Sequence, residues 1–478
     1  MSIKKNIFYS VSLSILNVLI PIVTAPYISR VLGVENLGVI RFVIANVNYF
    51  TLFATIGIGF YGVRELAKYK NDQIKCSQVF SSLFMIMLCS TLVVTLFFVL
   101  SINLIPEFKE YRLLFSLYGI TLYLSPIGMD WYFQAKENFR MITISSLVVK
   151  LLSVASLFIF VRERSDVLPY LLISIFSVVA TQVWNLLYAY KTGLRITLRN
   201  LELSRYFKPM FVFFCLKIVI SVYDSIEPIM VGFLSSYEQV GYYTSANMIL
   251  DMMLGAFYAI NAVLLARLSF NRAQNEDNTN AVLLQKAFDF NALLSVPMAI
   301  GLLLIASRFV PLFFGNEFIG SIVPMQVLSF RMILNILNSF FVVSILFVLG
   351  HEKKFLLVAV CTALLSFAFN LLFIPRFGAT GAAIVAIGIG GSFQIGFNLY
   401  YIYKITCIRL HWGAFRIAVI LSLPFFALHY LCNKFIMHDI AFLCIFIFLS
   451  SIVYFLLQFF AKNYLVRQLI DIGISKMK

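Results

Sequence analysis

The stretch 217–234, KIVISVYDSIEPIMVGFL, combines an apolar run with groups that could carry proton or ion chemistry. In an α-helix, Lys217 and Asp224 would lie about 20° apart on one face and about 10 Å apart along the axis, with Glu227 about 80° round. Carboxyl groups in low-dielectric surroundings hold protons more tightly than in water, so they can bind and release them near neutral pH. We therefore predict ion-coupling roles for Asp224 and Glu227. The alternative is that Lys217 pairs statically with these carboxylates.

Asp251, in the middle of the next apolar run, is predicted to join this ion-coupling site. The coupled ion would be a proton or sodium, with no organic cofactor and no bound metal. Asp130 and Asp289 lie near the ends of their runs and are expected to be interfacial. Pro228 removes one backbone hydrogen bond and crowds the carbonyl of the residue four positions earlier. We predict a hinge there and a second hinge at Pro26, in the first apolar run.

Four basic residues also fall inside apolar runs, and they predict a binding site for an anionic group: Arg41, Lys150, Lys217 and Arg331. A charge at mid-bilayer is costly and normally faces a partner or a water-filled cavity. Lys150 and Arg331 each lie about ten residues into a run, which is near its middle. A structural ion pair is the alternative for both residues, and Arg41, close to an end, could instead snorkel. A binding site for a cationic substrate would instead require acidic residues.

The elements that carry these residues are membrane-spanning helices. The 478 residues are 61% hydrophobic and only 12% charged, unlike a soluble globular domain. Apolar runs of about 20 residues, the length that crosses a bilayer core, predict an all-α integral membrane protein with fourteen helices. The predicted helices are 7–29, 37–62, 79–104, 111–133, 141–161, 167–190, 209–234, 240–266, 287–306, 321–349, 355–374, 378–403, 414–433 and 440–460.

The distribution of Lys and Arg predicts the orientation of these helices. With the N-terminus inside, the inner connecting segments hold 25 of the 37 basic residues and the outer segments hold 8. Because basic residues concentrate in cytoplasmic loops, both termini are predicted to be cytoplasmic. The same asymmetry accounts for the net charge of +16, so that charge does not indicate nucleic-acid binding.

The longest inner segments suggest how the chain divides. The basic segment 191–208 predicts a linker between an N-terminal six-helix bundle at 1–190 and a second at 209–403, with two additional helices and a cytoplasmic tail at 404–478. VENLG at 34–38 and YEQVG at 237–241 share a pattern of Glu, amide, aliphatic residue and Gly. Their equivalent positions in the two halves favour the internal repeats that transporters use.

Motifs for soluble catalysis are weak or missing. GIGFYG at 57–62 matches a dinucleotide fingerprint, but it ends a hydrophobic helix instead of joining a strand to a helix, so close helix packing is the better interpretation. No Walker, HExxH or GxSxG motif occurs, and no catalytic residue is predicted. The seven cysteines are odd in number and lack CxxC spacing, so no disulfide framework or zinc site is indicated.

Two N-terminal stretches, PYISRVLGVENLGVIRF (26–42) and YFTLFATIGIGFYGVREL (49–66), carry a family resemblance. They resemble the Wzx-type flippases of O-antigen and capsule synthesis, in the polysaccharide transporter branch of the multidrug/oligosaccharidyl-lipid/polysaccharide exporter superfamily. FGATGAA (377–383) is similar to a Gly-rich turn of these proteins. No individual site residue is carried over from the family.

The resemblance implies a MATE-like pair of six-helix bundles and alternating access. It implies a transporter, not an enzyme, that moves undecaprenyl-diphosphate-linked oligosaccharide from the inner to the outer leaflet of the bacterial plasma (inner) membrane. The expected partners are this lipid-linked substrate, membrane lipid, and the polysaccharide polymerase and chain-length machinery. The alternatives are a multidrug antiporter of the same fold and a membrane polysaccharide polymerase or ligase. The enzyme would need an extended outer loop, and the predicted outer loops are short.

Overall fold

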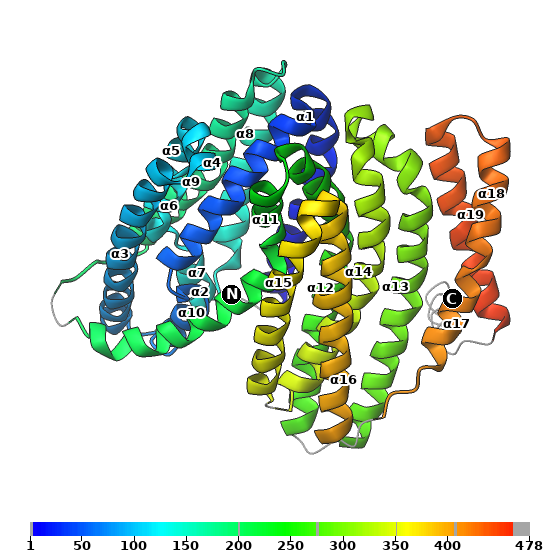
Figure 1. Cartoon of the computed structure of the whole chain (residues 1–478). Helices are drawn as coiled ribbons and strands as arrows, with labels where there is room; N and C mark the ends of the chain where they lie inside the picture. Colours follow the sequence, from blue (N-terminus) through cyan, green and yellow to red (C-terminus); the bar gives the residue numbers. More distant parts are fainter. Residues whose placement is uncertain (1–2, 199–200, 274–276, 350, 406–408, 462–478) are drawn as a thin grey trace. The chain divides into compact units, whose positions relative to one another are not determined.

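The computed structural model describes residues 3–198, 201–273, 277–349, 351–405 and 409–461, and these residues form helices and turns without a strand (Figure 1). The chain forms two compact units, Met1–Gly241 and Tyr242–Lys478. The elements up to the boundary are α1 (Ile3–Ala54), α2 (Ile58–Ala67), α3 (Gln73–Leu104), α4 (Pro106–Glu110), α5 (Arg112–Tyr118), α6 (Ile120–Tyr123), η1 (Ser125–Ile127), α7 (Asp130–Ala135), α8 (Phe139–Phe160), α9 (Val167–Lys191), α10 (Leu203–Ser225) and α11 (Glu227–Leu234).

Helix α12 (Tyr237–Ala273) begins at the boundary, and the second unit continues from it. Its other elements are α13 (Asp277–Phe314), η2 (Asn316–Ser321), α14 (Ile322–Ser339), the π-helical η3 (Phe340–Phe347), α15 (Glu352–Val385), the π-helical η4 (Ala386–Phe393), α16 (Gln394–Ile405), α17 (Gly413–Ser422), α18 (Pro424–Phe435) and α19 (Asp439–Phe460).

Among the described residues, ten helical segments are long and apolar enough to cross a membrane. Two of them, Ser12–Ala54 and Lys354–Lys404, have 43 and 51 residues, more than the roughly 20 that one crossing needs. Each contains a glycine that leaves the helical conformation, Gly33 at φ 77° and Gly378 at φ 53°. Positive φ is accessible to glycine without a Cβ clash, so these glycines divide the long segments into two crossings each.

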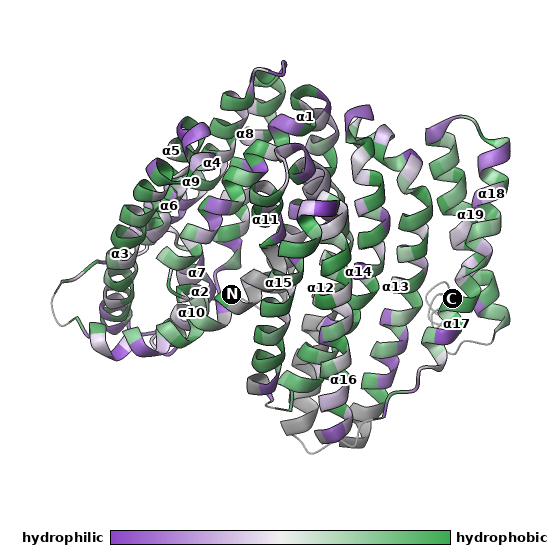
Figure 2. Cartoon of the chain, in the orientation of Figure 1, coloured by the Kyte–Doolittle hydropathy of each residue, from purple (hydrophilic) through white to green (hydrophobic). Residues whose placement is uncertain are grey.

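The predicted helices and the all-α membrane fold agree with this arrangement. Each of the fourteen apolar runs lies mainly on helix, although the second run continues past α1 through a turn into α2. Figure 2 shows hydrophobic residues along most of the helix lengths and hydrophilic residues mainly towards helix ends and connecting segments. The all-α membrane fold follows directly from composition because a helix satisfies its backbone hydrogen bonds within one segment.

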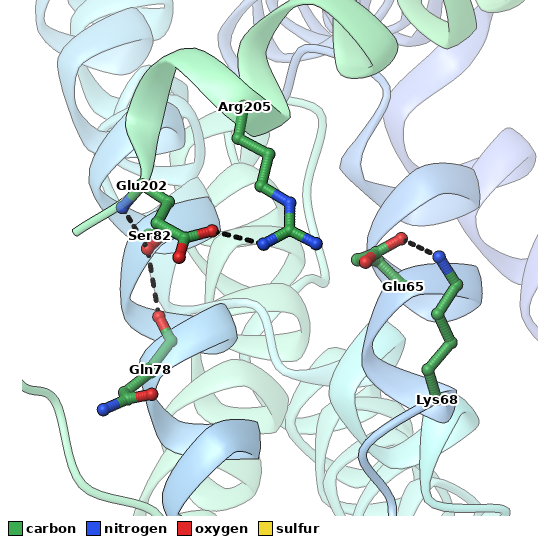
Figure 3. A network of polar contacts seen from close by, with 6 residues as sticks. All are labelled: Glu65, Lys68, Gln78, Ser82, Glu202 and Arg205. Atoms are coloured by element: carbon green, nitrogen blue, oxygen red, sulfur yellow. Dashed lines mark hydrogen bonds and ion pairs between the residues drawn. The ribbon is translucent and has the colours of Figure 1, made fainter. Parts of the chain in front are cut away.

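The boundary between the compact units differs from the predicted linker at 191–208. Helix α10 packs on α2 and α3, and α11 packs on α1, so both belong to the N-terminal unit. The described part of the linker lies along α3, where Thr197 N donates to Ser81 Oγ at 2.9 Å. Glu202 N donates to Ser82 Oγ at 3.2 Å (Figure 3). These serine hydroxyls supply the acceptors that an irregular backbone segment needs.

The predicted inner segments meet at one end of the N-terminal unit. Lys70 Nζ lies 2.8 Å from Glu137 Oε2, and Lys136 Nζ donates to Gln73 Oε1 at 3.1 Å. The loop after α2 and the loop after α7 therefore lie side by side. The linker that packs on the first turns of α3 lies at this same end.

The predicted outer segments meet at another place in the same unit. Asn36 Nδ2 donates to the carbonyl oxygen of Arg164 at 3.0 Å, which joins the junction in α1 to the turn between α8 and α9. The rings of Tyr111 and Tyr237 pack edge to face with centroids 5.0 Å apart. The alternation of loops deduced from basic residues is thus matched by which loops contact one another.

Two glycine patterns explain close packing in the N-terminal unit. A Cβ on Gly57 would lie 2.6 Å from Phe214 N, and one on Gly62 would lie 2.8 Å from the Trp131 ring. This confirms helix packing as the role of the GIGFYG sequence. The repeated pentapeptides contact each other: a Cβ on Gly38 would lie 1.7 Å from the carbonyl oxygen of Tyr237, and one on Gly241 would lie 2.5 Å from that of Val34.

In the C-terminal unit, α13 holds the last three helices at both of its ends. Gln285 Nε2 donates to the carbonyl oxygen of His411 at 3.0 Å, and His411 N donates back to Gln285 Oε1 at 2.9 Å. Towards the other end, Arg308 Nη2 donates to Asn433 Oδ1 at 2.5 Å and its guanidinium lies over the Phe442 ring. The predicted additional helices in 404–478 therefore dock on α13.

Candidate functional site

The predicted site residues fall into the two compact units. The N-terminal unit contains Arg41, Lys150, Lys217, Asp224, Glu227 and the two hinge prolines, whereas the C-terminal unit contains Asp251 and Arg331. The side chain of Asp224 lies outside the described residues. Of the other charged residues, Lys150 belongs to one polar cluster, and Arg331 and Asp251 belong to a second.

The first cluster surrounds Lys150 in the N-terminal unit. Lys150 Nζ donates to Asn17 Oδ1, which joins α8 to α1. Lys150 also interacts electrostatically with Asp130, the first residue of α7. Asn185 on α9 donates from Nδ2 to Asp130 Oδ1 at 2.9 Å. Four helices thus contribute one cation, one carboxylate and two amides to a connected cluster.

An interrupted helix places Asp130 in this cluster. The fourth predicted span is divided into α5, α6, η1 and α7, and the segment 124–129 has no regular α-helical hydrogen bonding. Irregular backbone at membrane depth is tolerated where protein or a water-filled cavity surrounds it. Ser125, Pro126 and Gly128 supply the residue types that end a helix. The interruption allows α7 to begin with Asp130 facing Asn185.

The exposure of these side chains indicates which of them meet water. Asn185 is 0% exposed, Lys150 is half-buried, and Asp130 and Asn17 are exposed. A carboxylate facing hydrocarbon is costly, and both neighbours of Asp130 in sequence, Met129 and Trp131, are buried. We therefore expect the exposed surface of Asp130 to face water. The sequence interpretation of Asp130 as an interfacial residue missed its link to Lys150.

The second cluster surrounds Arg331 in the C-terminal unit. Arg331, on α14, is 4% exposed, and its Nη1 donates to Tyr243 Oη at 3.3 Å and to Asn247 Oδ1 at 3.5 Å. Asn247 Nδ2 donates in turn to Asp251 Oδ2 at 2.8 Å. Asn247 and Asp251 are four residues apart on α12, so they lie on one helix face. A predicted anion-binding residue and a predicted ion-coupling residue are thereby connected through one amide.

The remaining predicted charged residues lie on α1, α10 and α11. Arg41 is half-buried on α1 and acts electrostatically on Tyr118 of α5. Lys217 is half-buried on α10, and Glu227 is 4% exposed as the first residue of α11. Helical hydrogen bonding is interrupted at Ile226, so the angle expected for a continuous helix between Lys217 and Glu227 does not apply.

The two hinge prolines differ in their surroundings. Pro228 occupies the first turn of α11, directly after the interruption, as its missing N–H favours. At Pro26, α1 continues, and its departure from helical geometry occurs at Gly33, seven residues later. Hinge motion at either proline stays a prediction, as do the substrate-binding and ion-coupling roles.

Sequence reasoning did not select the neutral members of the clusters: Asn17, Asn185, Tyr243 and Asn247. One of them carried a signal, because Asn247 stands four residues before Asp251. The Ser, Pro and Gly residues within 125–128 also indicated a helix break next to Asp130. Asn17 and Asn185 carried no local signal, since their partners lie on other helices.

Comparison with a protein-family collection gives a match to the family described as polysaccharide biosynthesis protein. The match covers residues 3–269, more than half of the chain. It includes the N-terminal stretches that carry the resemblance seen in the sequence, together with α10, α11 and nearly all of α12.

Two curated proteins are similar to the chain, both described as "Putative O-antigen transporter". That of Escherichia coli (strain K12) is 25% identical over 390 residues, which cover 81% of this chain and 94% of the relative. That of Shigella dysenteriae is 24% identical over 272 residues, which cover 56% of this chain and 67% of the relative. The first similarity extends well into the C-terminal unit, because it spans most of both proteins.

Solved membrane transporters share the fold. The lipid II flippase MurJ, in an inward closed conformation, aligns with a TM-score of 0.78 and 14% identity over 96% of this chain and 100% of that chain. An inward-facing multidrug resistance MATE family transporter of the MOP superfamily aligns with a TM-score of 0.62 and 14% identity, covering 84% and 98%. The expected MATE-like fold is thus confirmed, and because the family match covers most of its length, the chain belongs to the polysaccharide biosynthesis protein family.

Proposed function

We propose that the chain is a flippase for a lipid-linked oligosaccharide, the repeat unit of an O-antigen or capsule. Its substrate would be linked to undecaprenyl diphosphate and would move from the inner to the outer leaflet of the bacterial plasma membrane. The observation that carries this proposal is the family match over residues 3–269, supported by an O-antigen transporter relative aligned over 94% of its length. The shared fold with transporters supports a transporter over an enzyme.

The polar clusters suggest how such a substrate would be handled. The prenyl tail would stay in lipid while the polar headgroup meets basic residues: Arg41, Lys150 and Lys217 in the N-terminal unit, and Arg331 in the C-terminal unit. Arg331 is buried in the structure described here, so the substrate would reach it in another state of the transport cycle. Alternating access then requires that the substrate binds two states with different affinity.

The network from Arg331 to Asp251 offers a route for ion coupling. Asp251 is exposed and accepts a hydrogen bond from Asn247, which in turn accepts one from Arg331. Binding of a proton or sodium ion at Asp251 would change this acceptor and so change how Asn247 holds the guanidinium. If ion binding changes the affinity for the substrate, substrate binding changes the affinity for the ion by the same factor. Asp224 and Glu227 remain further candidates for this coupling.

A deletion strain of the native host, complemented by variants, tests the proposal. Without the protein, we expect surface polysaccharide to disappear and single undecaprenyl-linked units to accumulate on the cytoplasmic face. Wild-type protein should restore export, and Arg331→Gln should fail to do so at equal levels of folded protein. Arg409→Gln, which removes an exposed arginine in a predicted inner segment, is the matched control and should restore export.

Other outcomes would point to other functions. Units that reach the outer face but remain unpolymerised would indicate a polymerase or ligase. An unchanged surface with altered drug tolerance would indicate a multidrug antiporter. Full export by the Arg331→Gln variant would contradict the role of Arg331 while leaving the flippase function intact.

A further inference from the structure

The Lys150 cluster contains a carboxylate, that of Asp130, which a site for a diphosphate would not need. Lys150 and Asp130 carry opposite charges and interact with each other. A diphosphate at this place would be attracted by the ammonium group and repelled by the exposed carboxylate. The pair is therefore nearly neutral towards an anion, whereas the guanidinium of Arg331 is held at Nη1 by two neutral groups, Tyr243 and Asn247.

The hydrogen bonds within the cluster fix the orientation of its amides. Asn185 must direct its NH₂ group towards Asp130, because an ionised carboxylate only accepts hydrogen bonds. Its Oδ1, buried and without a partner among the described residues, is then an acceptor. Asn17 must direct its Oδ1 towards the ammonium group of Lys150, which only donates. The NH₂ group of Asn17 therefore remains available to donate a hydrogen bond, and the Asn17 side chain is exposed.

The neighbouring turn of α9 adds a further acceptor beside the interrupted helix. Gln182 lies three residues before Asn185, on the same helix face, and its Oε1 has no partner among the described residues. The amide of Gln182 lies close to Gly128, where a Cβ would come within 3.7 Å of Nε2. Asn185 Oδ1 and Gln182 Oε1 are buried, so the exposed polar groups of the cluster are the NH₂ donor of Asn17 and the carboxylate acceptor of Asp130, beside the half-buried Lys150.

Donor and acceptor groups held in one connected cluster match the chemistry of a sugar hydroxyl, which both donates and accepts. We propose that Asn17, Asp130 and Lys150 form a sugar-binding subsite that contacts the hydroxyl groups of the oligosaccharide, while the diphosphate binds elsewhere. Asn185 is a positioning residue that acts through Asp130. This inference rests on the proposed function and gives Lys150 a more specific role than binding an anion.

Binding of two probes to purified protein in lipid nanodiscs separates the sugar from the diphosphate. The probes are lipid-linked units extracted from the deletion strain and undecaprenyl diphosphate without sugar. Asp130→Asn should weaken binding of the lipid-linked units about tenfold, the effect of losing a hydrogen bond to a charged group. Its affinity for undecaprenyl diphosphate should stay unchanged. Asn185→Ala should give the same selective loss.

A control and a second variant keep the test decisive. Glu163→Gln makes the same change from carboxylate to amide at an exposed position in a loop of the same unit and should alter neither affinity. If Asp130→Asn lowers the amount of folded protein, Asn17→Ala, at an exposed position, should still weaken only the binding of lipid-linked units.

Three results would overturn the subsite. Equal weakening of both probes would show that Asp130 has a structural role only. Tighter binding of undecaprenyl diphosphate, with unchanged binding of lipid-linked units, would show that the cluster is an anion site. No change in either affinity would remove the cluster from recognition altogether. If wild-type protein binds neither probe, the proposed function itself fails, which is a different result from these.

Discussion

At the scale of single residues, Asp166 is held by two backbone amides in the turn between α8 and α9. Its Oδ2 accepts hydrogen bonds from Arg162 N and Glu163 N, each at 2.8 Å. These two bonds favour the ionised carboxyl and lower its pKa below the ordinary value of 3.8. The carboxylate therefore orders the turn as long as it remains ionised.

The stability of this turn should depend on pH. Because the pKa of Asp166 is lower in the folded turn than in the open one, its contribution is present at neutral pH and is lost as the pH falls below about 3.8. Hydrogen exchange followed by mass spectrometry should show that amide protection at 161–167, relative to intrinsic exchange, decreases over that range. Asp166→Ala should lower protection already at pH 7.

Glu163→Ala provides the control for this prediction, because it keeps the backbone amide that donates to Asp166. Protection should then persist at pH 7. Equal protection in the Asp166→Ala variant and the wild type would show that the carboxylate does not order the turn.

At the scale of elements, the two pentapeptides 34–38 and 237–241 meet through their glycines. The last residue of each pattern contacts the first residue of the other: Gly38 faces Tyr237, and Gly241 faces Val34. This reciprocal contact is what two equivalent segments related by a local two-fold axis would make. It supports the internal repeat that the sequence pattern suggested.

Alanine at Gly38 should destabilise the protein. The added Cβ would lie 1.7 Å from a backbone carbonyl oxygen, so two helical segments would have to separate. We expect a loss of about 1–3 kcal/mol or more, the cost of inserting atoms into a packed interface. The apparent melting temperature in detergent, followed by size-exclusion chromatography after heating, measures this loss.

Gly59→Ala is the matched control on α2. A Cβ at Gly59 meets no atom within 4 Å, and alanine favours a helix over glycine by about 0.5–1 kcal/mol. The control should therefore melt at the same or a slightly higher temperature. Equal melting of the Gly38→Ala and Gly59→Ala variants would mean that the glycine contact does not form in the membrane protein.

At the scale of the whole molecule, the alternation of loops predicts how the chain lies in the membrane. The loops with most basic residues contact one another in the N-terminal unit, as at Lys70 and Glu137, and the predicted outer loops contact one another separately, as at Asn36 and Arg164. Basic loops stay in the cytoplasm. We therefore expect both termini on the cytoplasmic side of the inner membrane.

Reporter fusions check this orientation. Alkaline phosphatase fused after Ser165, in a predicted outer turn, should be active, and green fluorescent protein fused there should be dark. Fusions after Thr192, in the predicted inner linker, should behave in the opposite way. The reverse pattern at both sites would invert the topology, and identical behaviour at both sites would contradict the crossing by α9.

The sequence by itself determined the all-helical membrane fold and the positions of the helices. Burial in lipid depends on the composition of each segment, and a helix forms its backbone hydrogen bonds locally, so neither property needs information about distant residues. The interruption next to Pro228 and the pairing of Asn247 with Asp251 could likewise be predicted, because both depend on local spacing in the sequence. The family resemblance at 26–42 and 49–66 was readable for the same reason.

Only the tertiary structure decided which charged groups meet. Lys150 and Arg331 looked alike in sequence, each a cation about ten residues into an apolar run. Their partners stand far away along the chain: Asn17 lies 133 positions from Lys150, and Tyr243 lies 88 positions from Arg331. Such contacts depend on how helices pack and rotate against each other, which hydrophobicity leaves undetermined because lipid-facing and protein-facing surfaces are both apolar. Packing therefore placed Asn17 and Asp130 beside Lys150, and Tyr243 and Asn247 beside Arg331.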